Sequence, residues 1–196
     1  MSGRLVTIEG GEGTGKSTLI AALAARLDGE VVATREPGGT PGAEALRDLL
    51  VMGEAARWDA MTEVLIVTAA RRDHVERVIR PALARGATVL CDRYVDSTRA
   101  YQGLRGAPRE AIDAVHARFV ALDPDRTLVL DLNPTVGLAR ARERGGADRY
   151  ERMGLDYHRD LRAAFLSIAA ADPVRCTVLD ASADPDALAD AALAAL

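Results

Sequence analysis

Short apolar segments alternate along the chain with longer segments that combine apolar and charged residues. The short ones are dense in Val, Leu, Ile and Thr and lack strict alternation, which is typical of strands buried on both faces of a parallel sheet. Five segments of this kind occupy residues 4–9, 31–36, 88–93, 127–132 and 176–181. They predict a five-stranded parallel sheet.

The longer segments predict helices, because their apolar positions recur at helical spacing and several begin at Pro or Asp. They cover residues 16–27, 42–52, 59–84, 108–122, 134–144, 153–171 and 184–196. Alternating strands and helices form right-handed crossover units, so the pattern predicts an open α/β fold with helices on both faces of the sheet. Residues 1–196 are expected to form one domain, because 196 residues is a single-domain length.

The composition argues against several classes of protein. The chain carries a net charge of −4, whereas a nucleic-acid binder is usually basic. It contains no apolar run of about 18 residues, the minimum for a membrane span, and its first residues show no secretion signal. Cys91 and Cys176 stand in predicted strands and are expected to be buried thiols. We therefore expect a cytoplasmic protein that binds neither nucleic acid nor membrane.

A glycine-rich segment follows the first predicted strand and opens the first predicted helix. Residues 10–17 read G-G-E-G-T-G-K-S and fit the pattern G-x-x-x-x-G-K-[ST]. Glycines let successive backbone N–H groups point at an anion, and the start of the helix adds its positive dipole. Lys16 can reach the β- and γ-phosphates of a nucleotide, and the Ser17 hydroxyl can bind Mg²⁺. The segment predicts a nucleoside triphosphate site.

Lys16 is the single lysine beside 24 arginines, and this narrows the choice of function. A GTP-binding switch protein needs a second lysine in an N-K-x-D element, so the lack of one argues strongly against that class. A mechanical ATPase usually ends an apolar strand in Asp-Glu, where the Glu activates water, but here Arg93 follows Asp92. Arginine cannot act as a base, whereas its planar guanidinium suits a second phosphate. This favours a nucleoside-monophosphate kinase.

Four arginines stand near the edge of the sheet where the strands end. Arg35 and Arg93 end predicted strands, and the carboxyl ends of parallel strands meet at one edge. Arg47 and Arg71 stand on predicted helices, where a lone arginine is usually solvated. The strand positions therefore indicate a second anion site, and the helix positions add less to that argument.

A further concentration of arginines precedes a pair of glycines at 145 and 146. The spacing of Arg140, Arg142 and Arg144 puts them on different faces of a helix, and the glycine pair can act as a hinge. Two interpretations stay open: a lid at about residues 142–151 that covers the phosphates, or a solvated helix end.

These motifs together resemble the thymidylate kinase family. They are I-E-G-x-E-G-x-G-K-S at 8–17, T-R-E-P-G-G-T at 34–40, A-E-x-L-R-x-L-L at 43–50, A-A-R at 69–71, D-R-Y at 92–94, S-T-x-A-Y-Q-G at 97–103, and R-A-R-x-R-G followed by D-R at 140–149. The resemblance implies a P-loop fold of nucleoside-monophosphate-kinase architecture. It also implies an enzyme that phosphorylates dTMP to dTDP with ATP and Mg²⁺ in dTTP biosynthesis. Family members are typically homodimers, so a homodimer is expected.

The resemblance implies roles for residues of the acceptor site. Glu12 would accept the 3′-hydroxyl of the deoxyribose, Arg47 and Arg93 would hold the dTMP phosphate, and Tyr101 would pack under the sugar. The full set expected to bind dTMP is Glu12, Glu36, Arg47, Arg71, Arg93, Ser97, Thr98, Tyr101 and Gln102.

It also implies the residues of the donor site and of catalysis. Lys16, Asp92, Arg93 and Arg144 would be catalytic, and Arg144 would be the foremost arginine of the lid. Ser17 and Asp92 would bind Mg²⁺, partly through water. The residues expected to bind ATP are Gly10, Gly11, Glu12, Gly13, Thr14, Gly15, Lys16, Ser17 and Thr18.

One departure from the family concerns the base. Arg71 and Gln102 would face the thymine ring, with Ser97 or Thr98 nearby. The family commonly has a phenylalanine four residues before the arginine, where this chain has Val67. Stacking on the thymine would then become an aliphatic contact. Two alternatives stay open: a kinase of the same fold for another acceptor such as dUMP, and a nucleotide-binding regulatory or motor ATPase.

Overall fold

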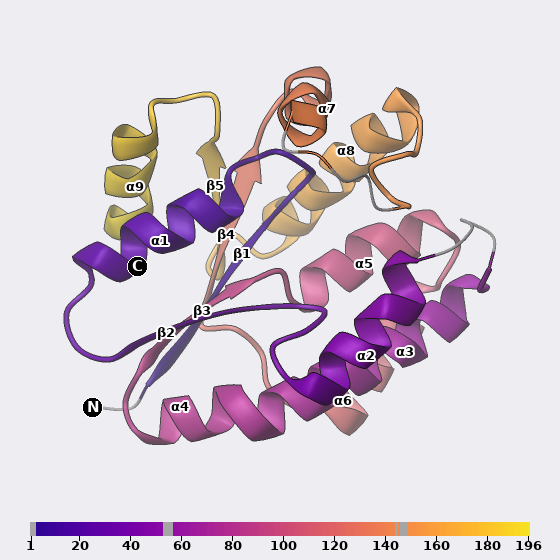
Figure 1. Ribbon diagram of the computed structural model, residues 1–196, viewed down its shortest axis with the longest axis horizontal. Coiled ribbons are helices and arrows are strands. Elements are labelled where there is room, and N and C mark those ends of the chain that lie inside the picture. The colour runs from indigo at the N-terminus through magenta and orange to yellow at the C-terminus, as the bar shows by residue number, and fades with distance from the viewer. Residues whose placement is uncertain (1–2, 53–56, 144, 146–148) are drawn as a thin grey trace.

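The computed structural model describes residues 3–52, 57–143, 145 and 149–196. Its strands form one parallel sheet in the order β2-β3-β1-β4-β5, with β1 in the centre (Figure 1). They are β1 (Arg4–Gly10), β2 (Val31–Arg35), β3 (Thr88–Asp92), β4 (Arg126–Asp131) and β5 (Cys176–Asp180). Each lies within one residue of its predicted bounds, and the predicted five-stranded parallel sheet is confirmed.

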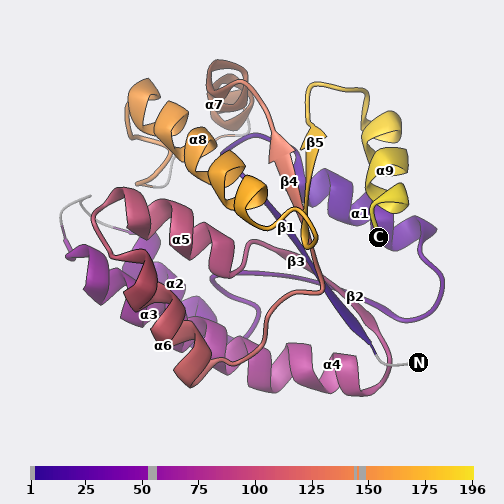
Figure 2. The ribbon, with the colours of Figure 1, turned by 180° about the vertical axis from the view of Figure 1, so that it is seen from behind.

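Helices cover both faces of this sheet, as Figures 1 and 2 show from opposite sides. One face carries α1 (Lys16–Arg26) and α9 (Pro185–Ala194). The other carries α4 (Arg80–Ala84), α5 (Val95–Leu104) and α8 (Leu155–Ala171). The helices α2 (Pro41–Val51), α3 (Ala60–His74) and α6 (Arg109–Phe119) pack outside α5, and α7 (Pro134–Glu143) packs on α8. Among the described helices, none is long and apolar enough to cross a bilayer.

The central strand shows how the sequence pattern produces these layers. Val6 and Ile8 of β1 are fully buried and belong to the core beneath α1 and α9. Leu5 is also fully buried but belongs to the core on the opposite face, together with Val75 and Ile79. Successive side chains of a strand point to opposite faces, so a strand covered on both sides is apolar almost throughout.

Two helical segments differ from the prediction. The expected single helix at 59–84 is α3, then a π-helical turn η1 (Val75–Ile79), then α4. Pro81 lacks the N–H that a regular helix would use, and a wide turn just before it relieves that conflict. The helix α5 was not predicted, because Ser97, Thr98 and Gly103 have low helix propensity and its buried face includes polar residues.

Candidate active site

The phosphate loop is the turn that leads from β1 into α1. Gly10, Gly13 and Gly15 have φ values of 135°, 68° and 90° there, which only glycine adopts without strain. A Cβ atom at Gly13 would also overlap the carbonyl group of Gly137 on α7. Glycine is therefore required both by the curl of the loop and by the close approach of α7.

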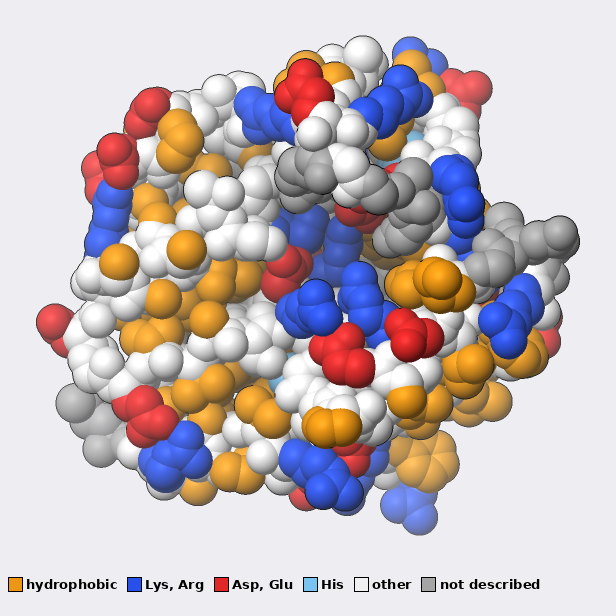
Figure 3. Space-filling view, viewed as in Figure 1, with side chains coloured by type: hydrophobic (Ala, Val, Ile, Leu, Met, Phe, Trp, Pro, Cys, Tyr) orange, Lys and Arg blue, Asp and Glu red, His pale blue; other side chains and the backbone are white. Residues whose placement is uncertain are grey.

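Lys16 lies buried beneath this loop. Its Nζ donates hydrogen bonds to the carbonyl oxygens of Gly11 at 2.8 Å and Gly10 at 3.3 Å. Burial lowers the pKa of Lys16 to about 8, and the nearby Arg93 charge adds to that lowering. Lys16 also lines the cavity above the loop, together with Arg35, Arg47 and Arg93. Basic side chains gather in the hollow at the middle of the face in Figure 3, as a phosphate site requires.

Ser17 and Asp92 meet at the mouth of the same cavity. The Ser17 hydroxyl, at the start of α1, donates a hydrogen bond to Asp92 Oδ2 at 3.1 Å, and Asp92 ends β3. Both side chains line the cavity above the phosphate loop. Hydroxyl and carboxylate oxygens are the hard ligands that Mg²⁺ prefers, and Mg²⁺ usually binds through few protein ligands beside nucleotide phosphates. This donor set fits the predicted metal.

A second cavity adjoins the first and runs between α2, α3 and α5. It contains Val67 at the position where the family commonly has phenylalanine, and Tyr150 from the segment before α8. Four residues line both cavities: Glu12, Glu36, Arg47 and Arg93. All nine residues predicted to bind dTMP line the second cavity: Glu12, Glu36, Arg47, Arg71, Arg93, Ser97, Thr98, Tyr101 and Gln102.

Arg93 and Glu12 form the boundary between the two cavities. Their side chains make an ion pair of 2.8 Å, and the Tyr101 hydroxyl donates to the same Glu12 oxygen at 2.6 Å. Burial raises the pKa of Glu12, but the charges of Arg93 and Lys16 and the Tyr101 hydroxyl outweigh it and lower the pKa to about 2. Glu12 is therefore an ionised acceptor at neutral pH.

The turn after β3 positions the Arg93 side chain. Arg93 was predicted to end that strand, but β3 stops at Asp92 and Arg93 has a positive φ of 69°. Non-glycine residues in this region are strained, and such strain often marks a functional site. The turn directs the guanidinium back toward β1, where it donates to the Gly10 carbonyl at 2.9 Å.

Arg71 is held by a buried chain of hydrogen bonds. Its Nε donates to Glu36 at 2.6 Å, and its Nη2 donates to the Thr98 hydroxyl at 2.9 Å. Glu36 in turn bonds His74 Nδ1 at 3.0 Å, and His74 Nε2 bonds the Thr34 hydroxyl at 2.7 Å. These bonds leave the guanidinium little freedom, so β2, α3 and α5 together fix its position at the cavity wall.

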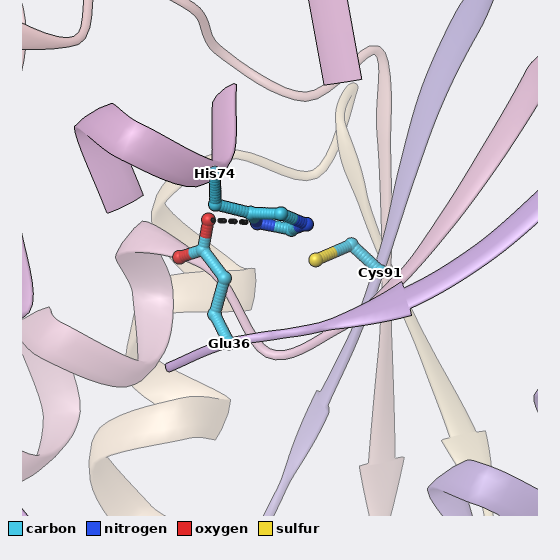
Figure 4. A group of neighbouring side chains, drawn as sticks. All are labelled: Glu36, His74 and Cys91. Atoms are coloured by element: carbon cyan, nitrogen blue, oxygen red, sulfur yellow. Dashed lines mark hydrogen bonds and ion pairs between the residues drawn. The ribbon is translucent and has the colours of Figure 1, made fainter. Parts of the chain in front are cut away.

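Glu36, His74 and Cys91 are the one trio of potential metal ligands found among the described residues (Figure 4). Both ring nitrogens of His74 are engaged, by Glu36 and by Thr34. Burial raises the pKa of the Cys91 thiol well above its usual range, whereas a metal needs the thiolate. The Arg71 cation already pairs with Glu36. The trio therefore serves as a hydrogen-bonded wall of the site and is unsuited to a metal.

Gln102 contacts a buried cluster that the sequence analysis did not find. Its amide donates to Glu63 of α3 at 3.1 Å and to the Tyr150 hydroxyl at 3.2 Å. Glu63 is fully buried and also pairs with Arg149 and with Arg105. The cluster joins α3, α5 and the segment before α8 at the closed end of the second cavity.

The remaining predicted residues differ in placement. Arg47 lines both cavities and donates to the Pro37 carbonyl at 2.9 Å, whereas Arg35 forms an exposed ion pair with Glu44. Gly145 lines the cavity above the phosphate loop. Thr18, predicted to bind ATP, is exposed on α1. Arg144 and residues 146–148 lie outside the described residues.

The residues that the sequence analysis missed share one signal. Glu9, Glu63 and His74 are charged or polar residues that are fully buried in their elements. A buried charge is costly unless hydrogen bonds satisfy it, so such a residue points to a built polar network. Glu9 stood in an apolar segment, and its charge there was the available clue.

Comparisons with known proteins agree with this geometry. The sequence profile of the family described as thymidylate kinase matches residues 8–191. The thymidylate kinase of Caulobacter vibrioides is 56% identical over 191 residues, which cover 95% of this chain and 92% of that protein. That of Jannaschia is 51% identical over 94% of this chain and 91% of its own.

A solved structure extends the agreement to the fold. The crystal structure of thymidylate kinase from Ehrlichia chaffeensis superimposes with a TM-score of 0.80 at 29% identity, covering 99% of this chain and 98% of that one. The family profile, the two relatives and this structure each match over most of the chain's length. The chain belongs to the thymidylate kinase family.

Proposed function

We propose that this chain transfers the γ-phosphoryl group of ATP to dTMP and so forms dTDP for dTTP biosynthesis. One observation carries the proposal: the cavity above the phosphate loop and the cavity lined by α5 share Glu12, Glu36, Arg47 and Arg93. A donor phosphate on the loop and an acceptor phosphate in the second cavity would therefore meet at these arginines. The similarity to thymidylate kinases over nearly the whole chain supports the choice of acceptor.

The donor site would hold ATP on the phosphate loop. Backbone N–H groups of the loop, the start of α1 and the Lys16 ammonium would bind the phosphates. Thr18, one residue into α1 from Ser17, would line the donor phosphates. Ser17 and Asp92 would hold Mg²⁺, which in such enzymes neutralises charge on the phosphates.

The acceptor site would hold dTMP with its phosphate toward the loop. Arg47 and Arg93 would bind that phosphate, because a planar guanidinium binds phosphate through paired hydrogen bonds. Glu12, which stays ionised, would accept the 3′-hydroxyl. The base would lie at the closed end between Arg71 and Gln102, with Val67 in aliphatic contact with the ring.

Transfer would need positioning and charge stabilisation and no general base, because the dTMP phosphate is anionic near neutral pH. Arg93 would hold the attacking oxygen near the γ-phosphate, and Lys16 would neutralise the charge that spreads over the phosphate oxygens. Arg144 would add a second positive charge from the lid. Residues 142–151 would be that lid in a single kinase domain spanning residues 1–196.

The proposal also covers assembly and location. Leu65 of α3 and Phe119 of α6 are each 54% exposed on helices that pack together, and this supports a homodimer formed through them. Cys91 and Cys176 are unpaired thiols, in keeping with the reducing cytoplasm.

An assay with ATP and a panel of nucleoside monophosphates tests the proposal. We expect dTMP to stimulate ADP formation far more than dUMP, dCMP, dGMP or AMP. Preference for another member of the panel would indicate a kinase of the same fold with a different acceptor. ATP hydrolysis that is independent of every acceptor would instead indicate a regulatory or motor ATPase.

A further inference from the structure

The helix α5 carries much of the proposed acceptor site but has no capping side chain of its own at its start. Ser97, Thr98, Tyr101 and Gln102 all lie on it. The first N–H groups of a helix have no partners within the helix and are usually satisfied by an N-cap side chain. Here the N-cap residue is Tyr94, whose side chain makes no capping bond and whose hydroxyl donates to the Leu122 carbonyl instead.

Glu9 of the central strand satisfies this helix start from a distance. It is fully buried on the face of β1 that α5 covers. Its Oε1 accepts hydrogen bonds from the backbone N–H of Tyr94 at 2.8 Å and of Ser97 at 3.2 Å. Its Oε2 lies 2.6 Å from the Ser97 hydroxyl. A carboxylate at a helix N-terminus is also favoured by the helix dipole.

The contacts of Glu9 also connect it to the strained turn that contains Arg93. The Arg93 N–H donates to the Ile8 carbonyl at 2.9 Å, next to Glu9 on β1. Its Nη1 donates to the Ser97 hydroxyl oxygen at 3.3 Å, and that hydroxyl bonds Glu9. Glu9 therefore contacts the backbone on the far side of Arg93 and, through Ser97, its guanidinium.

We propose that Glu9 is a positioning residue of the acceptor site, which fixes the start of α5 and, through the Ser97 hydroxyl, orients Arg93 toward the acceptor phosphate. The inference rests on the proposed function, since it assigns Arg93 to the dTMP phosphate. Glu9 does not line either of the two cavities, so it acts through Ser97 and Arg93.

The groups around Glu9 make its protonation state depend on pH near neutrality. Burial raises the pKa of Glu9 to about 7, Asp96 on α5 adds to the rise, and Ser97 and Arg93 oppose it. Lys16 of α1 and the thiols of Cys91 and Cys176 also lie near Glu9. Arg175 pairs with the neighbouring Asp96. Glu9 thus changes protonation state near neutral pH.

The two protonation states differ in how they hold Ser97. Ionised Glu9 accepts the Ser97 hydroxyl proton, so the Ser97 oxygen is left to accept from Arg93. Protonated Glu9 instead donates to the Ser97 oxygen, which keeps a second lone pair for Arg93, but the carboxylate charge that attracts the Arg93 guanidinium is lost. Glu9→Gln imitates the protonated state, because its amide oxygen can still accept from both N–H groups while its NH₂ donates to Ser97.

Steady-state kinetics on the full chain test the inference, with the exposed Glu110→Gln on α6 as the control. Loss of a helix cap predicts that Glu9→Ala raises the KM for dTMP roughly tenfold, with the KM for ATP changed less than about twofold. At pH 6, the KM for dTMP of Glu9→Gln should lie much closer to the wild-type value than that of Glu9→Ala. Equal rises in both KM values, or an unchanged KM for dTMP, would overturn the inference.

The pH profile provides a readout that does not depend on the alanine variant folding. The ratio of the KM for dTMP at pH 6 to that at pH 8 should be several-fold larger in the wild type than in Glu9→Gln. The titration of dTMP itself affects both proteins equally and cancels. Equal ratios would overturn the inference, whereas an inactive wild type would instead refute the proposed function.

Discussion

The proposed donor and acceptor sites lie side by side but are built in different ways. The donor site comes largely from one continuous stretch, the phosphate loop, whose glycines turn backbone N–H groups inward. The proposed acceptor site draws on the segment after β2, on α2, α3 and α5, and on the phosphate loop itself, and it depends on buried side chains that hold one another. A site made of backbone groups keeps its shape when neighbouring side chains are substituted. A site made of paired side chains loses its geometry when one partner is substituted.

Two glutamates of the same segment illustrate the difference. Glu12, in the loop, faces Arg93 and Lys16, and their charges hold its pKa at about 2. Glu9, three residues earlier in β1, is fully buried, and burial raises its pKa to about 7. The first is a charged group that can face a ligand, and the second is an internal group that fixes backbone. Variants of the two sites should therefore fail in different ways.

The largest effect is expected at the donor site. Lys16→Ala removes the ammonium that contacts the loop and should lower kcat about 10²- to 10³-fold, as the loss of one stabilising donor does elsewhere. Urea unfolding should show little change in stability, because the burial of the ammonium lowers its pKa and so is itself unfavourable. Full activity in Lys16→Ala would refute the donor assignment.

The contribution of Glu12 to the stability of the folded chain should be lost in acid. Its pKa of about 2 lies below the ordinary value of 4.5, so its contribution to stability is present above pH 4.5 and is lost as the pH falls toward 2. Glu12→Gln should therefore lower the free energy of unfolding at pH 7 by up to about 3 kcal/mol. Denaturant unfolding between pH 7 and pH 3 measures this, and a difference that does not shrink in acid would contradict it.

A smaller and more selective effect is expected at Arg144 of the proposed lid. Arg144→Ala should lower kcat by at least about tenfold while the affinity for dTMP stays nearly unchanged, because it would stabilise charge only during transfer. Arg118→Ala, on the exposed side of α6, is a suitable control. A large loss of dTMP affinity in Arg144→Ala would place that arginine in the acceptor site instead.

The smallest effect concerns the base. Val67 lines the acceptor cavity and is nearly buried. Val67→Phe should lower the KM for dTMP about fivefold, since an aromatic contact adds roughly 1 kcal/mol beyond burial. Val174→Phe, at an 81% exposed position, controls for the added ring. A raised KM would show that the pocket has no room for the ring and that the aliphatic contact is its working form.

The sequence pattern predicted every strand of the sheet but did not predict the helix α5. The strands of the sheet are apolar because helices cover both faces, so their burial is written into consecutive residues. The helix α5 contains residues of low helix propensity and has no capping side chain of its own, and Glu9, 85 residues earlier in the chain, bonds its start instead. A helix stabilised from so far away leaves no local signal.

The arginines also differ in ways that the sequence pattern does not show. The composition made most of them look like solvated surface, yet Arg149 is almost completely buried against Glu63, and Arg71 is locked between Glu36 and Thr98. Nothing in the spacing of Arg71 distinguishes it from the exposed Arg72 beside it on α3, because burial depends on which segments fold over a residue.

The amino-acid sequence by itself determined the strand–helix alternation and the phosphate loop, since both depend on neighbouring residues and on what glycine and a single lysine allow. Its family motifs also indicated the residues of the acceptor site. Only the tertiary structure decided how those residues are held. The bonds of Glu9 to α5, of His74 to Glu36 and of Glu63 to Gln102 join distant segments. Burial makes such contacts energetically decisive, and burial is a property of the folded chain.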